Sequence, residues 1–284
     1  ELHASVAEFQ PEVIFHLAAQ PLVRDSYRIP RETYETNVMG TVNLLEAARH
    51  SASVRSVVVV TTDKVYENRE WHWGYRENDR LGGYDPYSNS KAAAELAVAA
   101  YRSSFFNIDQ YRKSHQVSLA SARAGNVIGG GDWAADRIVP DLVRAWFDNE
   151  PATIRNPLAI RPWQHVLEPL SGYLIVAERL YGSPEYGAEW NFGPRESDCI
   201  SVDDLAAVFE EVCTGLKIHR GSSVGPHEAS FLKLDISKSG ADLGWTPKWN
   251  VHRAIQVTVD GYQALKRAPS REPLVAAIQE YAEL

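Results

Sequence analysis

Tyr87 and Lys91 lie four positions apart at the start of an alanine-rich stretch that is typical of a helix. Asp85 suits the N-cap of that helix and Pro86 its first position, so both side chains should lie on one helix face. The ordinary pKa of a phenol is about 10, and a neighbouring ammonium favours the phenolate. The pair could therefore act as a general base.

The spacing alone is common, because Tyr262 and Lys266 repeat it in a later helical stretch. We interpret that second pair as a solvated helix face, since no polar strand end precedes it. Tyr87 is set apart by its context, because the polar segment Thr61–Lys64 comes shortly before it.

Thr62, Asp63 and Lys64 follow the apolar run Val57–Val60, which is typical of a buried parallel strand. Ligands of open α/β sheets bind beyond the carboxyl ends of the strands, so these three residues are placed where chemistry is usually done. The alternatives are a threonine favoured by its strand and a surface Asp–Lys pair that contributes little.

Alternating strand and helix signals predict the elements that position these residues. A helix ends near Phe9, and strands over Val13–Ala19, Val54–Thr61 and Val117–Ala124 alternate with helices over Asn37–Arg49 and Pro86–Ser103. The second half is mixed, with helices over Ile138–Asp148 and Pro169–Leu180, a strand over Trp190–Phe192, and a helix from Ser201 to Cys213. We therefore expect an α/β fold: a doubly wound, Rossmann-like parallel sheet with a smaller mixed α/β domain.

Composition places the chain among ordinary globular proteins, with 284 residues, 44% hydrophobic content and a net charge of −8. The negative charge argues against a nucleic-acid binder or a protein of anionic membranes. Cys199 and Cys213 form no disulfide framework or metal pattern, so we expect no metal site and a reducing cytoplasm.

The glycine-rich turn that binds a dinucleotide normally follows the first strand of such a fold, and the sequence does not show it there. No Gly-x-Gly-x-x-Gly occurs before Val13, and the first strand-turn-helix unit of the nucleotide-binding half is therefore expected to be absent. The segment Gly129–Ala134 satisfies a looser form. We interpret this segment as unrelated to dinucleotide binding, because no acidic residue ends a following strand about twenty residues further on, as the dinucleotide-binding motif requires.

Longer motifs extend over essentially the whole chain, and with them the sequence resembles the extended short-chain dehydrogenase/reductase family, most closely its CDP-sugar dehydratase branch. The stretches that carry the resemblance are His16–Gln20, Asn37–Thr41, Thr62–Asn68, Gly82–Lys91, Arg123–Trp133 and Arg161–Val166. Related dTDP-glucose dehydratases look similar but carry Glu where Lys64 stands.

The resemblance implies NAD-dependent dehydration of a nucleotide-diphosphate hexose, namely CDP-D-glucose to CDP-4-dehydro-6-deoxy-D-glucose. The reaction comprises oxidation at C4, elimination across C5–C6 and hydride return to C6. Tyr87 would be the base for O4, with Lys91 in support, and Thr62 would hydrogen-bond the sugar hydroxyl or Tyr87. Asp63 would be the acid at O6 and Lys64 would act at C5. A homodimer or higher homo-oligomer is implied, through the helices expected over Asn37–Arg49 and Pro86–Ser103.

The resemblance also assigns binding residues and domains. For NAD these are Leu17, Ala18, Ala19, Gln20, Asn37, Thr61, Tyr87 and Lys91, within a domain formed by 1–126 and 162–193. For the nucleotide sugar these are Asn126, Arg137, Arg155 and Arg161, within a domain formed by 127–161 and 194–284. Arginine forks suit diphosphate oxygens, although each arginine alone is equally compatible with an ordinary surface residue. Asn37 could instead simply open its helix.

Two other functions remain open at this point. A nucleotide-sugar 4-epimerase or reductase has the same fold, but simple 4-epimerisation needs no acid at C6, which argues for the dehydratase given Asp63 and Lys64. A chain that only binds is the other alternative. This alternative is based on the expected lack of a glycine-rich turn. Because such a turn normally holds the pyrophosphate of NAD, we expect residues 1–284 alone to bind NAD weakly.

Overall fold

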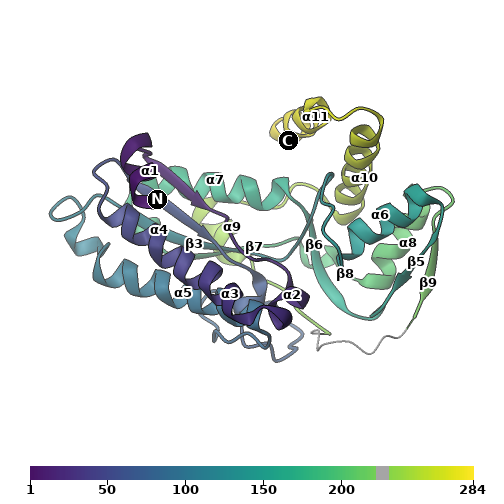
Figure 1. The fold of residues 1–284 in the computed structure, drawn as a ribbon, viewed down its shortest axis with the longest axis horizontal. Coiled ribbons are helices and arrows are strands. Elements are labelled where there is room, and N and C mark those ends of the chain that lie inside the picture. Colours follow the sequence, from purple (N-terminus) through teal and green to yellow (C-terminus); the bar gives the residue numbers. More distant parts are fainter. Residues whose placement is uncertain (222–229) are drawn as a thin grey trace.

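A computed structural model describes residues 1–221 and 230–284. One part of the molecule contains a four-stranded parallel sheet in the order β1-β2-β3-β7. The strands are β1 (Val13–His16), β2 (Ser56–Val60), β3 (Ser118–Ala124) and β7 (Glu189–Phe192). Figure 1 shows this sheet between helices below and above it. The doubly wound parallel sheet predicted from the sequence is thus confirmed.

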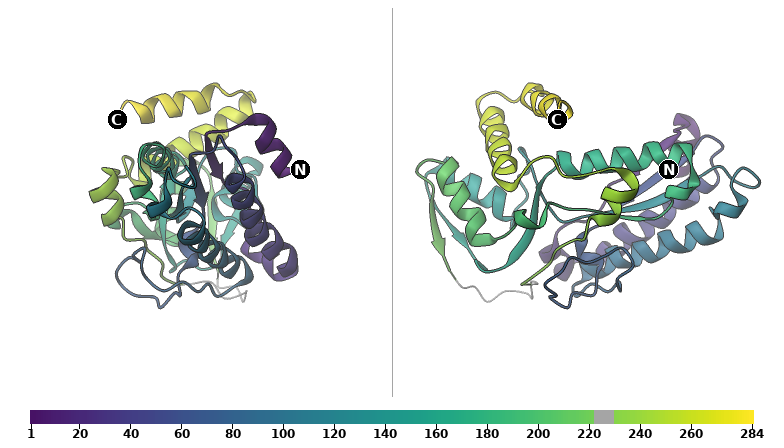
Figure 2. Two further views of the ribbon diagram at one scale, coloured as in Figure 1. Left: turned by 90° about the vertical axis from the view of Figure 1, so that its left-hand side faces the viewer. Right: turned by 180° about the vertical axis from the view of Figure 1, so that it is seen from behind.

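Strand β2 is buried on both faces, which explains its uninterrupted apolar sequence. Val57 and Val59 pack in one hydrophobic cluster with residues of α4 (Gly40–Arg49) and α5 (Pro86–Ser104). Val58 packs in another cluster with residues of α7 (Leu167–Gly182), on the opposite face of the sheet. The sheet is therefore the middle of three layers, as the two further views of Figure 2 also show.

The second half has its own small sheets and its own core. Strands β4 (Asn126–Ile128) and β6 (Ile160–His165) are parallel, β8 (Cys199–Ser201) joins β6 antiparallel, and β5 (Pro151–Ile154) pairs with β9 (Lys217–Arg220) in parallel. Helices α6 (Ile138–Asp148), α8 (Val202–Val212) and α10 (Val251–Arg267) pack on them in a separate hydrophobic cluster. The mixed α/β character predicted for this half is confirmed.

The remaining elements connect and cover these two parts. They are α1 (Leu2–Phe9), α2 (Val23–Arg28), α3 (Pro30–Tyr34), the π-helix η1 (Glu35–Met39), α9 (Ser237–Leu243), α11 (Glu272–Ala282) and the short 3-10 helices η2 (Asp63–Val65), η3 (Ile108–Gln110), η4 (Pro184–Tyr186) and η5 (Glu196–Asp198). Helix α11 packs on α10, and α9 packs on β7. Among the described residues, no helix is long and apolar enough to cross a membrane.

Asn37 does not open a helix, so that prediction is wrong. The helical run begins at Pro30 and continues through α3, η1 and α4 without a break, which places Asn37 in the middle of η1. A π-helical turn carries an additional residue, and such turns are frequent at functional sites. Here the turn directs the Asn37 amide inward, where it is buried.

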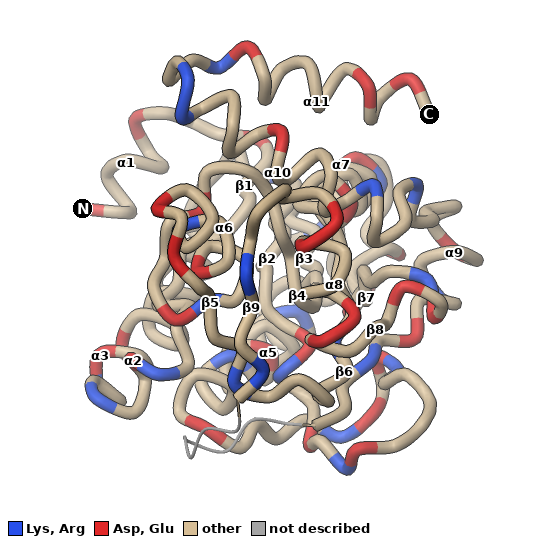
Figure 3. Tube along the Cα trace, turned by 90° about the vertical axis from the view of Figure 1, so that its right-hand side faces the viewer, with Lys and Arg blue, Asp and Glu red and all other residues tan. Residues whose placement is uncertain are grey.

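The predicted N-terminal caps of α5 and α8 are confirmed. Ser201 forms the capping box with Asp204 at the start of α8, and the Asp85 carboxylate accepts a hydrogen bond from the Ser88 N–H at the start of α5. Figure 3 shows basic and acidic residues interspersed along the chain rather than separated into blocks.

Candidate active site

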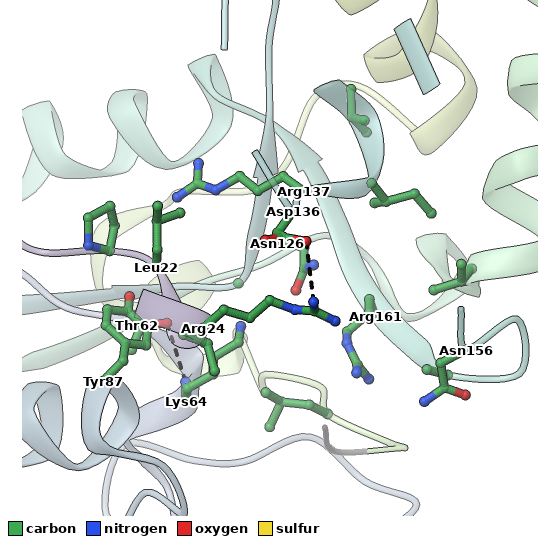
Figure 4. Close-up of a pocket in the computed structure, with 18 of the residues that line it drawn as sticks. Leu22, Arg24, Thr62, Lys64, Tyr87, Asn126, Asp136, Arg137, Asn156 and Arg161 are labelled. Carbon is green, nitrogen blue, oxygen red and sulfur yellow. Dashed lines mark hydrogen bonds and ion pairs between the residues drawn. The ribbon is translucent and has the colours of Figure 1, made fainter. Parts of the chain in front are cut away.

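A cavity of about 980 Å³ lies between the two halves of the molecule, beyond the carboxyl end of β2. Figure 4 shows Tyr87, Thr62 and Lys64 at one end and Arg161 and Asn156 toward the other. Three of the predicted catalytic residues, Thr62, Lys64 and Tyr87, line this cavity. All four predicted substrate-binding residues line it as well, some of them more than 60 positions away in the sequence.

Asp63 lies behind the cavity wall with its side chain fully buried. Its Oδ1 accepts hydrogen bonds from the Thr62 hydroxyl and from Lys64 Nζ, both at 3.0 Å. Its Oδ2 is buried without a partner among the described residues. A Cβ at Gly125 would lie 3.1 Å from that oxygen and 2.5 Å from Pro162, so glycine is needed there. The three residues thus form one connected group with an unused carboxylate oxygen.

Tyr87 is buried at the first turn of α5 and lines the cavity. Burial raises the pKa of Tyr87 to about 12, while a hydrogen bond with Thr62 and the charge of Arg137 lower it. Removal of the phenol from water therefore outweighs these two effects in the protein alone, and the support of the phenolate by Lys91 stays a prediction.

Lys91 is also buried, and its Nζ donates to the Val60 carbonyl oxygen at 2.9 Å. Burial lowers the pKa of Lys91 to about 8, and the charge of Glu95 opposes this shift. Lys91 consequently holds α5 against the end of β2, directly before the Thr62–Lys64 group.

Glu95 and Arg123 form a buried ion pair beneath these residues that the sequence analysis missed. Arg123 Nε and Nη2 donate to the two Glu95 oxygens at 2.9 and 2.8 Å. Thr61 and Ser121 donate their hydroxyls to the same carboxylate, and Arg123 Nη1 donates to the Tyr66 hydroxyl. The available signal was that Glu95 follows Lys91 by one helical turn, which continues the stripe that starts at Tyr87.

The residues predicted to bind NAD lie after the ends of β1 and β2 and on η1 and α5. Apart from Tyr87, none of them is among the residues that line the cavity. Leu17 and Ala18 are exposed after the last strand residue. The Asn37 amide donates to the Gln20 carbonyl and to the Ser90 hydroxyl, and accepts from the Gln20 N–H at 2.8 Å. Thus Asn37 fixes the loop after β1 to α5.

The residues predicted to bind the nucleotide sugar all line the cavity. Asn126 Oδ1 is buried without a partner among the described residues. Arg137 pairs with Asp132 at 2.9 Å, and Arg161 Nη1 donates to the Ile160 carbonyl at 3.0 Å. Arg155 pairs with Asp136, whose carboxylate also contacts Arg24 of α2. Arg24 was not predicted, although its place shortly after the first strand is a signal that could have identified it.

The second Tyr-x-x-x-Lys match is not a solvated face. Tyr262 is fully buried, and its hydroxyl donates to the Asp132 carbonyl oxygen, whereas Lys266 is exposed. The prediction failed because Tyr262 lies on the face of α10 that packs against the Gly129–Trp133 loop. A Cβ at Gly130 would lie 2.8 Å from the Gly261 Cα, so the glycines of this loop permit its contact with α10.

His165 and the two cysteines are buried groups with shifted pKa values. Burial lowers the pKa of His165 to about 4, and its ring packs against Trp249. Burial raises the pKa of both Cys199 and Cys213 to about 12, and neither thiol forms a disulfide. No cluster of metal-ligating side chains occurs within the described part of the chain.

Comparisons with known proteins agree with this geometry. Residues 1–168 match the model of a family described as GDP-mannose 4,6 dehydratase. A CDP-glucose 4,6-dehydratase of Salmonella typhimurium is 52% identical over 269 residues, which cover 93% of this chain and 74% of that protein. A probable dTDP-glucose 4,6-dehydratase of Sinorhizobium fredii is 26% identical, over 89% of this chain and 73% of that protein.

Among solved structures, DesIV of Streptomyces venezuelae, a dTDP-glucose 4,6-dehydratase with NAD and TYD bound, matches with a TM-score of 0.77 at 23% identity. The match covers 93% of this chain and 77% of DesIV. MoeE5 in complex with UDP-glucose and NAD matches with a TM-score of 0.79 at 24% identity, over 93% of this chain and 82% of MoeE5. At these identities the structural matches establish the shared fold.

Proposed function

Because this chain belongs to the GDP-mannose 4,6-dehydratase family, within the extended short-chain dehydrogenases/reductases, we propose that it is an NAD-dependent hydro-lyase acting on a nucleotide-diphosphate hexose. The observation that carries the proposal is the cavity itself. It joins a phenol, a threonine hydroxyl and an ammonium at one end to several guanidinium groups farther along. A hexose at the first end and its diphosphate among the arginines match that order of groups.

The substrate is CDP-D-glucose and the product CDP-4-dehydro-6-deoxy-D-glucose. Support comes from the 52% identity to a CDP-glucose 4,6-dehydratase and from Lys64, which follows Asp63 as the resemblance to the CDP-sugar branch requires. Asn126, Arg137, Arg155 and Arg161 hold the nucleotide diphosphate.

NAD fits the residues beside the cavity. Ala18 and Ala19 leave the end of β1 open to the approach of a large ligand, and the loop that contains them is fixed by Asn37. Lys91 uses one proton for Val60, and an ammonium carries further protons for ribose hydroxyls. The cofactor residues are thus Leu17, Ala18, Ala19, Gln20, Asn37, Thr61, Tyr87 and Lys91. NAD supplies the hydride acceptor for C4 and the hydride that returns to C6.

The side chains of this chain move the protons. Tyr87 takes the proton from O4, which requires its phenolate and therefore relies on Thr62 and Arg137 to offset the effect of burial on its pKa. Lys64 acts at C5 and Asp63 supplies the proton for the leaving O6. Asp63 Oδ1 accepts hydrogen bonds from both Lys64 and Thr62 and so orients these two side chains. The Oδ2 atom, which has no partner among the described residues, carries the proton that is donated.

The experiment is to incubate the protein with NAD and CDP-glucose without added reductant and to analyse the product by mass spectrometry and NMR. We expect a sugar nucleotide that has lost one water and carries a C4 ketone and a C6 methyl group. UDP-glucose and dTDP-glucose serve as controls for base selectivity. A product that is only the C4 epimer would contradict the dehydratase proposal.

We also propose which domain binds which ligand and how two copies of the protein associate. Residues 1–126 and 162–193 hold NAD, whereas 127–161 and 194–284 hold the nucleotide sugar. The protein forms a homodimer through α4 and α5, where Leu96 is 61% exposed. A cytoplasmic location agrees with the unpaired cysteines.

A further inference from the structure

Three charged side chains meet in the middle of the cavity, one from each of three separate segments. Arg24 on α2 reaches across the cavity, where its Nη1 lies 3.3 Å from Asp136 Oδ1 (Figure 4). Arg155, directly after β5, places its own Nη1 3.2 Å from the same oxygen. All three residues line the cavity. Asp136 therefore joins the helix that follows β1 to the strand end in the second half.

The two guanidinium groups share a single carboxylate, so the three side chains together carry one net positive charge. The side chains of Arg24, Asp136 and Arg155 are 34%, 47% and 33% exposed, so solvent screens their attraction. A partly exposed ion pair of this kind contributes little stability and exchanges readily for a better anion. A diphosphate offers guanidinium groups more charge and more acceptor oxygens than one carboxylate does.

We propose that Arg24 is a substrate-binding residue and that the Asp136 carboxylate is displaced by the substrate, whose diphosphate takes its place between Arg24 and Arg155. This inference rests on the proposed function, since its ligand is the diphosphate of the nucleotide sugar. Asp136 thereby acts on selectivity, because a ligand with little negative charge cannot replace a carboxylate at two guanidinium groups. The nucleotide-binding half, through α2, then contributes directly to holding the sugar nucleotide.

The first test is calorimetric binding of CDP to Asp136→Asn. Asp136 has a φ of 61°, a left-handed conformation that asparagine also tolerates, so the substitution removes the charge without straining the loop. We expect CDP to bind about three- to tenfold more tightly, as fits the loss of two partly exposed ion pairs. Cytidine, which has no phosphate, should bind equally to both proteins. Asp203→Asn, which removes a carboxylate paired with Arg220 on the surface of the second half, should leave CDP binding unchanged.

The second test separates displacement from a general loss of negative charge. Arg24→Gln should weaken CDP binding, and adding Asp136→Asn to that variant should tighten binding much less than in the parent protein. A purely long-range effect of charge would give the same tightening in both backgrounds. Asp136→Gly, which also accepts the left-handed conformation, provides an alternative variant if Asp136→Asn folds poorly.

The two tests can each overturn a separate part of the proposal. Unchanged or weaker CDP binding by Asp136→Asn overturns displacement, and unchanged binding by Arg24→Gln overturns the role of Arg24. A parent protein that is folded but does not bind CDP contradicts the proposed function itself, and this inference with it. That failure is distinguishable, because it appears before any variant is made.

Discussion

The Asp63 carboxylate has one oxygen occupied by Thr62 and Lys64 and the other buried without a partner among the described residues. Asp63→Asn keeps the shape but cannot donate a carboxyl proton, so we expect C4 oxidation to persist while elimination stops. Mixing with CDP-glucose should produce NADH absorbance with no C6 deoxygenation. Asp260→Asn, on the exposed face of α10, is the control and should behave as the parent does. Deoxygenation at the parent rate in Asp63→Asn would show that another group is the acid.

Lys91 gives the site an expected pH limit. Because burial lowers its pKa to about 8, its ammonium is lost as the pH rises through that value, far below the ordinary value for lysine. Lys91 should therefore be fully charged below pH 7 and lose its charge as the pH passes 8, so activity that depends on this charge should fall above pH 8. Glu95 favours this charge, and the same charge, together with burial, lowers the pKa of His16 of β1.

The pH dependence of kcat measures this limit. In Glu95→Gln the opposing charge is removed, so the alkaline limb should move to lower pH. A profile for the parent protein that stays flat to pH 9.5 would contradict the role of Lys91 as a charged group.

At the level of elements, the Glu95–Arg123 pair connects α5 to β3 and, through Thr61, to the end of β2. Replacing one partner leaves a buried charge uncompensated, so Glu95→Gln or Arg123→Met should each lower the free energy of unfolding by about 3–5 kcal/mol. The double variant Glu95→Leu/Arg123→Met should lose less than either single variant, because both charges leave together.

Urea unfolding curves provide the measurement for this pair. The surface pair Arg253–Glu280 is the control, and Glu280→Gln should cost less than about 1 kcal/mol. Additive losses in the double variant would mean that the two buried side chains act independently.

The same elements show how far sequence can go. The parallel sheet, α5 and α8 were predictable because their signals are local: an apolar run in β2, a cap and proline before Tyr87, and a capping box at Ser201. The π-helical turn around Asn37 was not, since it has no local signature and depends on contacts with Gln20 and Ser90.

The other parts of the site depend on contacts between segments that are distant in the sequence. Asp136 contacts Arg24 and Arg155 because a loop and two elements from different parts of the chain converge on the cavity. Tyr262 was misread for the same reason, since the loop that covers it lies far away in sequence. Long-range packing of this kind leaves no periodic pattern, so residue type alone identified candidate arginines but not their partners.

At the scale of the whole molecule, the outer face of α4 and α5 is the expected dimer interface. Leu96 lies exposed on α5, on the side of the sheet opposite α7, and a leucine that is 61% exposed on a helix face suits contact with a second copy. Leu96→Glu would place a charge in that contact and should convert the dimer to a monomer. Leu174 on α7 is 62% exposed on the other face of the sheet, so Leu174→Glu is a matched control that should remain dimeric. Light scattering after size exclusion measures the mass of each variant. A parent protein that is monomeric, or a Leu174→Glu variant that dissociates while Leu96→Glu does not, would assign association to another face.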